Sequence, residues 1–314
     1  MVCVLGGSGF VGRSLCNQLV RNGYSVRVPT RNRARRRDLL VLPGVDLVAA
    51  DIHAAGALGA LLDGCDAGVN LVGILNERAH DGSGFKSVHV DLVERLAHAC
   101  QDVGVTRLIH VSALKANAER GPSHYLRTKG QAEGLLRRLC GDDVKFTIFR
   151  PSVIFGPDDS FINRFAALLR RVPLLPVPQL GARFAPVYVE DVAAAIVKAL
   201  EDSSTHNQTY ELCGPDIYTL GEILQFVLRQ LEIRRWVVPV PLFIARVQAW
   251  IADYLVPGKP FSLDNLRSLY VASVCSENGF AALGIEPKPM HAIVPSYIGH
   301  DLPRLAKLRQ TTRR

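Results

Sequence analysis

The chain has 314 residues, of which 48% are hydrophobic and 21% charged, a composition typical of a folded globular protein and not of a disordered one. Its formal net charge is +8, but residues 27–37 hold six arginines and residues 304–314 hold five lysines or arginines, with no acid in either segment. The rest of the chain is slightly acidic, so the basicity forms two local patches and we expect no nucleic-acid binding. Nowhere do about 18 apolar residues follow one another without interruption, so we expect no transmembrane segment.

The cysteines and the N-terminus indicate the compartment. Seven cysteines are scattered singly, at positions 3, 16, 65, 100, 140, 213 and 275. Their odd number and the lack of a CxxC pair favour reduced thiols over a disulfide framework or a zinc site. The first apolar run, Met1–Leu5, is too short for the core of a signal peptide. We therefore expect a cytoplasmic protein without a bound metal.

Short apolar runs alternate with segments of helical spacing through the first half of the chain. The expected strands are Val2–Leu5, Ser25–Val28, Val45–Ala49, Gly68–Val72, Arg107–Val111 and Lys145–Phe149. This alternation predicts an α/β protein with a Rossmann-type, doubly wound parallel sheet and a smaller mixed C-terminal lobe. We expect the dinucleotide-binding domain over residues 1–155, with strand contributions to about residue 215. The smaller substrate or partner lobe then covers residues 156–303, followed by a basic tail over 304–314.

Prolines cluster after Phe149, where the chain crosses toward the second lobe. Two helices are expected there, one over Asp191–Leu200 and one that begins at Thr219 with a capping box to Glu222. Farther on, large apolar residues recur at helical spacing between Trp236 and Val256, namely Phe243, Val247, Trp250, Ile251 and Tyr254. We favour a helix that packs in the core. The alternative is a partner or membrane-interface surface, assisted by the basic tail.

A glycine-rich loop follows the first expected strand and opens the first expected helix. It comprises Gly6, Gly7, Ser8, Gly9, Phe10, Val11 and Gly12. Glycines in this context allow a tight turn, and they let backbone N–H groups approach a pyrophosphate at the start of a helix. The spacing fits both GxGxxG and GxxGxxG, and the plain alternative is a strand–helix turn without a ligand. We predict that this loop binds a nicotinamide dinucleotide.

The end of the second strand bears on which dinucleotide binds. An NAD-selective site places Asp or Glu there to accept from the ribose 2′-hydroxyl, whereas this chain has Arg31 and Asn32 and no acid. The guanidinium fork of Arg31 can pair with a 2′-phosphate, and Arg33 and Arg35 are weaker candidates. NADP(H) is therefore favoured, with NAD(H) as the alternative. Asp51 and Ile52 close the third strand, where such folds hold the adenine.

A tyrosine and a lysine stand four residues apart on an expected helix, at Tyr125 and Lys129, and so share one face. The lysine would lower the phenol pKa by its charge and anchor the nicotinamide ribose. The tyrosine would exchange a proton with a substrate carbonyl or carbinol. This pair is informative because it lies downstream of a glycine loop and a fifth strand.

The glycine loop, Asp51-Ile52, Tyr125-x-x-x-Lys129 and Arg150-Pro151-x-x-x-Phe155-Gly156-Pro157 together resemble the extended short-chain dehydrogenases/reductases over roughly residues 1–230. A closer resemblance is to their atypical branch, which contains the NADPH-binding accessory subunit of respiratory complex I and its bacterial relatives. That resemblance rests on the glycine loop, Val88-His89-Val90, His110-Val111-Ser112-Ala113-Leu114, Tyr125-Leu126-Arg127-Thr128-Lys129-x-x-x-Glu133 and Phe155-Gly156-Pro157-x-Asp159-x-Phe161. It implies a firmly held nucleotide, contacted also at Val72, Gly73, His89, Pro151 and Val153.

The chain departs from the pattern of active members at two places. His89 stands where the supporting asparagine is expected, and the hydroxyl that should face Tyr125 falls near Leu114, with Ser112 two residues earlier. Losing one such donor lowers a rate by about a hundredfold. One hypothesis is a cofactor-holding accessory or regulatory protein of a respiratory or membrane-associated assembly, peripheral at the inner face of the membrane. The other is an active oxidoreductase or epimerase-like enzyme that uses Tyr125, Lys129 and Ser112 on a quinone, an isoprenoid-like carbonyl compound or a nucleotide sugar.

Overall fold

The computed structural model describes residues 1–77, 79–141, 143–254 and 262–299, with the side chains of 251–254 left aside. The expected basic tail, 304–314, lies outside the described residues. The chain divides into two units, each assembled from three stretches. Unit 1 comprises Met1–Pro151, Val189–Leu212 and Ser276–Glu286, and unit 2 comprises Ser152–Tyr188, Cys213–Cys275 and Pro287–Arg314.

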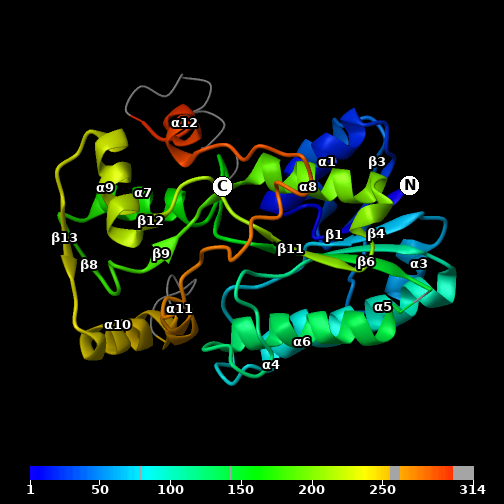
Figure 1. Ribbon diagram of the computed structural model, residues 1–314, viewed down its shortest axis with the longest axis horizontal. Coiled ribbons are helices and arrows are strands. Elements are labelled where there is room, and N and C mark those ends of the chain that lie inside the picture. Colours follow the sequence, from blue (N-terminus) through cyan, green and yellow to red (C-terminus); the bar gives the residue numbers. More distant parts are fainter. Residues whose placement is uncertain (78, 142, 255–261, 300–314) are drawn as a thin grey trace. The chain divides into compact units, whose positions relative to one another are not determined.

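A parallel sheet of seven strands forms the centre of unit 1 (Figure 1). Its strands are β1 (Val2–Leu5), β2 (Val26–Thr30), β3 (Val45–Ala49), β4 (Ala67–Asn70), β5 (Arg107–Val111), β6 (Lys145–Pro151) and β11 (Gln208–Leu212). Their order is β11-β6-β5-β4-β1-β2-β3, so the chain winds outward in both directions from β1 and β4. The predicted doubly wound sheet is confirmed. The seventh strand, β11, pairs in parallel with β6 and places Gln208 opposite Thr147.

Helices cover both faces of this sheet. They are α1 (Phe10–Arg21), α2 (Arg37–Leu40), α3 (Ala57–Leu62), α4 (Ser83–Lys86), α5 (Leu92–Val103), α6 (His124–Leu139) and α8 (Val189–Glu201), with shorter turns η1 (Arg33–Arg35), η2 (Ser87–Asp91) and η3 (Ser203–Thr205). Figure 1 shows α1 and α8 on one face and α5 and α6 on the other. Side chains from α3, α5 and α6 pack on the sheet in one buried cluster that includes Leu62, Leu92 and Leu108. Each fully buried leucine contributes about 1.5–3 kcal/mol, so this cluster stabilises the packing of these helices on the sheet.

Unit 2 holds three small two-stranded sheets and its own core. Its elements are β7 (Ile154–Phe155), α7 (Ile162–Arg171), β8 (Leu174–Val177), β9 (Arg183–Phe184), β10 (Val187–Tyr188), β12 (Tyr218–Thr219), α9 (Leu220–Leu231), β13 (Trp236–Pro239), α10 (Leu242–Tyr254), α11 (Leu263–Ser268), α12 (Met290–Ile293) and η4 (Val294–Ser296). The capping box expected at Thr219 is confirmed, because its hydroxyl accepts from Glu222 N–H and the Glu222 carboxylate accepts from Thr219 N–H. Among the described residues no helix is long and apolar enough to cross a bilayer.

The expectation that all cysteines are reduced is wrong for one pair. Cys213, directly after β11, and Cys275 form a disulfide although 62 residues separate them in sequence. No short-range motif predicts such a bond, because only the folding of the chain brings the two positions together. The other five cysteines are free and buried.

The favoured interpretation of the Trp236–Val256 segment as a core-packing helix is also wrong. In α10 the small residues Ala245 and Ala249 are fully buried, whereas Phe243, Val247 and Trp250 are 69%, 55% and 49% exposed. The helix therefore packs through its alanines and presents its large apolar side chains outward. The side chains of Ile251 and Tyr254, and all of residues 255 and 256, lie outside the described part of the chain.

Candidate functional site

The glycine loop connects β1 to α1 through a turn that requires glycine. Gly6 has φ +80°, and the Gly9 N–H donates to the Gly6 carbonyl at 2.9 Å. A Cβ on Gly12 would lie 2.4 Å from both Gly6 O and Gly7 Cα, closer than any side chain allows. The start of α1 thus lies directly against the loop, which glycine alone permits.

The loop also leaves the N–H groups at the start of α1 without a side-chain cap, so that they can bind an anion. Its N-cap, Gly9, offers no side chain to the first helical N–H groups, and the first turn from Phe10 holds no acid. Such a helix start carries unpaired N–H donors and the positive end of the helix dipole. A pyrophosphate fits these donors, and Ser8, Gly9, Phe10, Val11 and Gly12 are the residues that would hold it.

The loop lies beside the end of β4 and, through it, beside the Tyr–Lys pair. A Cβ on Gly6 would lie 3.2 Å from Val72 N, and the Val72 N–H donates to Asn70 Oδ1 at 3.0 Å. Lys129 Nζ lies 3.5 Å from Val72 O, and a Cβ on Gly73 would lie 3.4 Å from that same ammonium group. The fold therefore brings the predicted loop, β4-end and Tyr–Lys residues into one continuous site.

Exposed arginines follow the end of β2, and Arg13 of α1, which was not among the predicted site residues, lies near the same segment. Arg31 and Arg35 are exposed, while Asn32 Oδ1 accepts from Arg35 N–H at 3.2 Å and caps the turn η1. In the first turn of α1, Arg13 Nη1 contacts Ser8 O at 3.5 Å, and its Nε lies 3.8 Å from the Asp38 carboxylate. Arg13 thus joins the glycine loop to the arginine-rich segment. An arginine directly after the last glycine was the only sequence signal for it.

Asp51 and Ile52 follow β3 as predicted but face different surroundings. Asp51 is exposed, and its carboxylate accepts from His53 N–H at 3.0 Å. Ile52 packs against the buried cluster of unit 1. Elsewhere, Pro151 ends β6 and its carbonyl accepts from Leu114 N–H at 3.0 Å. Val153 lies in unit 2, against the core of that unit.

Burial governs the Tyr–Lys pair. The Lys129 ammonium donates to Val111 O at 2.9 Å, and burial lowers its pKa to about 8, although the charge of Glu133 acts in the opposite direction. Burial raises the pKa of the Tyr125 phenol to about 12. The expected lowering of the phenol pKa by Lys129 is not found. Near neutral pH Tyr125 therefore stays protonated, and Lys129 is held by main-chain carbonyls of its own fold.

His89 lies in the π-helical turn η2 and packs edge-on against Tyr125, with ring centroids 5.5 Å apart. Its Nε2 accepts from Ile74 N–H at 3.2 Å, which leaves Nδ1 to donate to Thr128 Oγ1 at 3.0 Å. Burial, together with the charge of Lys129, lowers its pKa to about 2. His89 is therefore a neutral, fully bonded side chain that positions the Tyr125 ring.

This buried histidine predicts a loss of stability in mild acid. The folded pKa of His89 lies below its ordinary value of 6.5, so the unfolded chain binds the extra proton and stability falls as pH drops below 6.5. One such histidine lowers the free energy of unfolding by about 2 kcal/mol between pH 6.5 and pH 5. In urea titrations, His89→Asn should reduce this dependence by that amount, while the part due to buried His110, whose pKa is also lowered by burial, remains. His98→Asn, at an exposed position, is the control. Parallel curves for wild type and His89→Asn would contradict the assignment.

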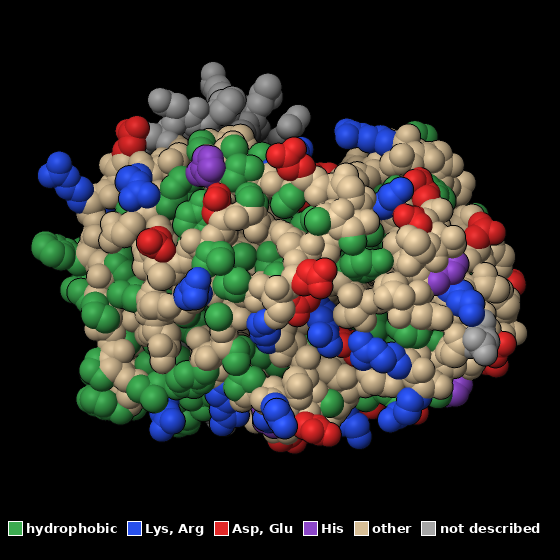
Figure 2. All heavy atoms as spheres, viewed as in Figure 1, with side chains coloured by type: hydrophobic (Ala, Val, Ile, Leu, Met, Phe, Trp, Pro, Cys, Tyr) green, Lys and Arg blue, Asp and Glu red, His purple; other side chains and the backbone are tan. Residues whose placement is uncertain are grey.

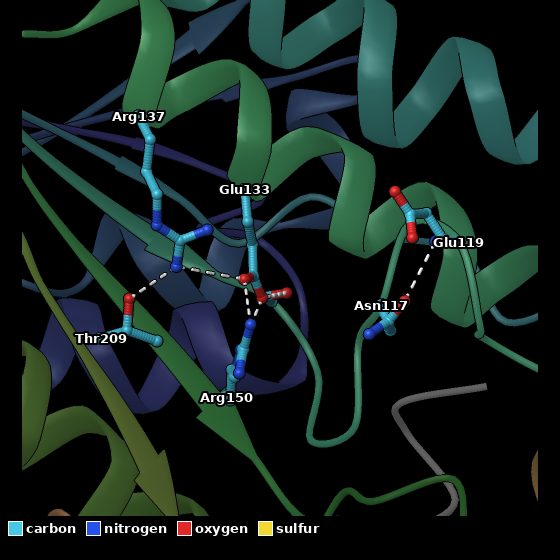
Figure 3. A network of polar contacts seen from close by, with 7 residues as sticks. Asn117, Glu119, Glu133, Arg137, Arg150 and Thr209 are labelled. Atoms are coloured by element: carbon cyan, nitrogen blue, oxygen red, sulfur yellow. Dashed lines mark hydrogen bonds and ion pairs between the residues drawn. The ribbon is translucent and has the colours of Figure 1, made fainter.

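Ser112 belongs to a buried network around Glu133, whose position between Arg137 and Arg150 is visible in Figure 3. The Ser112 hydroxyl donates to Glu133 Oε1 at 2.6 Å, and Arg150 holds both carboxylate oxygens. Arg137 contacts Glu133 at 3.5 Å and donates to Thr209 Oγ1 at 2.9 Å. The hydrogen bond to Glu133 raises the pKa of the Arg150 guanidinium. The single O–H of Ser112 is thus used inside the fold, and the buried side chain at position 114 is an apolar leucine.

Among the described residues no group of three His, Cys, Asp or Glu side chains is arranged to hold a metal ion. The site consists of the N–H groups at the start of α1, the exposed Arg31, Arg33 and Arg35 after β2, here called the arginine-rich edge, and the Tyr125–Lys129 pair.

Known proteins resemble this chain over most of its length. Mitochondrial NADH dehydrogenase (ubiquinone) 1 alpha subcomplex subunit 9 is 32% identical in Arabidopsis thaliana, over 88% of this chain and 71% of that protein. The Mus musculus protein of the same name is 30% identical, over 91% and 76%. A ceramide reductase of Caulobacter vibrioides is 32% identical over 63% of this chain and 60% of its own length. The solved structure of MoeE5 with UDP-glucuronic acid and NAD superposes with a TM-score of 0.74 at 16% identity, over 99% of each chain.

The family model for NAD dependent epimerases and dehydratases matches residues 2–213, which include the glycine loop, Tyr125, Lys129 and the whole seven-stranded sheet. The fold and the site geometry agree with that match. The chain belongs to the NAD dependent epimerase/dehydratase family.

Proposed function

We propose that this protein holds NADP(H) as an accessory component of a respiratory, membrane-associated assembly and does not turn the nucleotide over. The proposal rests on one observation, namely that the polar side chains around Tyr125 are already engaged in hydrogen bonds within the protein. Lys129 is bound to Val111 O, Ser112 donates to Glu133, and His89 has both ring nitrogens engaged. The loop that would hold the pyrophosphate is complete, whereas the groups that would assist proton transfer serve the fold.

The likeness to subunit 9 of NADH dehydrogenase supports the assembly part of this proposal, because that likeness covers about nine-tenths of the chain. We place the protein on the cytoplasmic side, peripheral at the inner face of the membrane. The arginine-rich edge supports NADP(H) over NAD(H), since no acid stands at the end of β2 to accept from a ribose 2′-hydroxyl.

The preference for NADP(H) predicts an asymmetric effect at Arg31. Arg31→Glu should weaken NADPH binding at least tenfold more than NADH binding, because a charge-assisted hydrogen bond to phosphate contributes about 1.5–3 kcal/mol. Arg37→Glu changes the net charge equally at an exposed position in the same segment and serves as the control. Calorimetric titration of both dinucleotides checks this. Equal losses of affinity for NADPH and NADH in Arg31→Glu would show that Arg31 does not contact the 2′-phosphate.

Retention of the nucleotide tests the holding role. Native mass spectrometry of the freshly purified protein should show one NADP(H) per chain, lost only slowly on dilution. Tyr125→Phe should retain it too, because the proposed contacts to the phosphates come from the glycine loop and Arg31. A protein that purifies without dinucleotide, and binds it only at millimolar concentration, would refute the proposal.

One observation favours a second function, an active oxidoreductase or epimerase-like enzyme. Tyr125 and Lys129 are both present and share one face of α6, with Lys129 buried and Tyr125 partly buried. Under this alternative Tyr125 donates its proton to a carbonyl of a quinone, an isoprenoid-like compound or a nucleotide sugar. Tyr125→Phe would then abolish a measurable turnover.

A further inference from the structure

Unit 2 presents an apolar and aromatic surface that the dinucleotide site does not use. We call it the aromatic face and define it by Phe243, Val247 and Trp250 of α10 together with Tyr270, which follows α11. These side chains are 45–69% exposed. Positions 243, 247 and 250 share one face of the helix, opposite the buried Ala245 and Ala249. Figure 2 shows hydrophobic side chains gathered at the lower left, over the region of α10 in Figure 1.

A groove of about 580 Å³ runs between α10 and α11, and most of its lining is apolar. Val247, Trp250 and Tyr270 form part of it, and Arg246 and Arg267 line it too. A helix of a soluble protein ordinarily turns its large apolar residues inward and its polar residues outward. On α10 large apolar side chains occupy the outward side, which indicates that this side is built for an apolar environment.

Positive charge lies at the groove beside the aromatic face. Arg246 and Arg267 line it, and none of the other described lining residues is acidic. Arg234 and Arg235 precede β13, the strand that leads to α10, with the exposed Glu232 beside them in sequence. The groove therefore complements negative charge.

Both tryptophans of the chain lie in this segment, and both are exposed: Trp250 on α10 and Trp236 on β13. Tryptophan and tyrosine favour the boundary between headgroups and acyl chains, where a ring is both apolar and able to hydrogen-bond. Arginines beside them pair with lipid phosphates. Aromatic rings and aliphatic side chains with arginines beside them are the composition of an interfacial membrane-binding surface.

We propose that the aromatic face docks on a lipid bilayer that contains anionic phospholipid, with α10 lying in the interface. The groove between α10 and α11 would take acyl-chain segments, and Arg246 and Arg267 would meet the phosphates. This inference deepens the proposed membrane-associated role by naming its surface, and it does not depend on retention of the dinucleotide. Phosphatidylglycerol vesicles therefore test it separately from NADPH binding.

The experiment is flotation of the full chain with phosphatidylcholine vesicles, with or without phosphatidylglycerol. We expect the protein to float with the anionic vesicles and much less with the neutral ones. Phe243→Ser and Trp250→Ser should each reduce partitioning about tenfold, the loss expected for removing one large apolar side chain from the bilayer. Arg246→Gln with Arg267→Gln should remove the preference for anionic vesicles. Val41→Ser, at a position 79% exposed in unit 1, is the matched control and should float like wild type.

Tryptophan fluorescence gives a second readout that is independent of flotation. In Trp236→Phe the remaining Trp250 should shift to shorter wavelength on addition of anionic vesicles and be quenched by brominated lipid. No flotation and no shift with either vesicle would overturn the proposal, as would an equal loss in Val41→Ser. A concentration-dependent dimer that Phe243→Ser dissolves, without vesicle binding, would also overturn it and assign the face to a second copy of the chain. Bound NADPH in Phe243→Ser should be unchanged, so failure of retention alone would count against only the proposed function.

Discussion

Replacement of Gly12 by alanine is expected to reduce NADPH affinity about a hundredfold. The new Cβ would lie 2.4 Å from Gly6 O and Gly7 Cα, which are main-chain atoms that cannot rotate away. Either the start of α1 or the loop at Gly6 must move, and the N–H donors then point away from the pyrophosphate. Loss of two charge-assisted hydrogen bonds at roughly 1.5 kcal/mol each corresponds to this factor.

Gly134→Ala is the matched control for this substitution, because its Cβ would meet nothing within 4 Å in the interior of α6. It should leave NADPH affinity unchanged and raise stability by up to about 1 kcal/mol, the difference in helix propensity between the two residues. Calorimetric titration and thermal unfolding of both variants separate binding from folding. NADPH affinity in Gly12→Ala within a factor of three of wild type would mean that the loop does not cradle the nucleotide.

Glu133→Ala is expected to lower the free energy of unfolding by about 3–5 kcal/mol, the effect of removing one partner from a buried ion pair. Glu133 is 1% exposed and holds Ser112, Arg137 and Arg150 at once (Figure 3). Without it the Arg150 guanidinium, which lies between α6 and β6, has lost its carboxylate. Urea unfolding at neutral pH measures the change.

Asp46→Ala provides the comparison at the surface, where Asp46 pairs with Arg27 at 3.6 Å and its side chain is 58% exposed. It should change the free energy of unfolding by less than about 1 kcal/mol. Similar small effects of both substitutions would show that the Glu133 network contributes little. Apolar packing, and not the ion pair with Arg150, would then stabilise the contact between α6 and β6.

Local sequence patterns predicted much of the fold. The bounds of β1, β3 and β5 are the expected ones, because each is a short apolar run closed by polar or glycine-rich sequence. The capping box at Thr219 was equally readable, since its two hydrogen bonds lie within four residues. The glycine loop also followed from local pattern, because its steric requirement lies within Gly6–Gly12 and the adjoining strand.

Features that depend on distant residues were not predictable in the same way. The periodicity of α10 fixed which residues share a face, but only the packing of Ala245 and Ala249 shows that the opposite face is exposed. Cys213 and Cys275 meet through the fold alone. The hydroxyl of Ser112 is directed to Glu133, 21 residues away, although its place at the end of a strand suggested chemistry. In each case contacts between residues far apart in the sequence determined the structure, and local sequence patterns do not specify such contacts.

The central claim of the proposed function is that the protein holds NADP(H) without using it. The most direct measurement is oxidation of stoichiometrically bound NADPH, followed by its absorbance, in the presence of quinone, isoprenoid-like carbonyl and nucleotide-sugar panels. We expect no oxidation above the rate of free NADPH, and the same trace for wild type and Tyr125→Phe. Oxidation by any of these compounds that Tyr125→Phe abolishes would contradict the holding role and make the protein an enzyme.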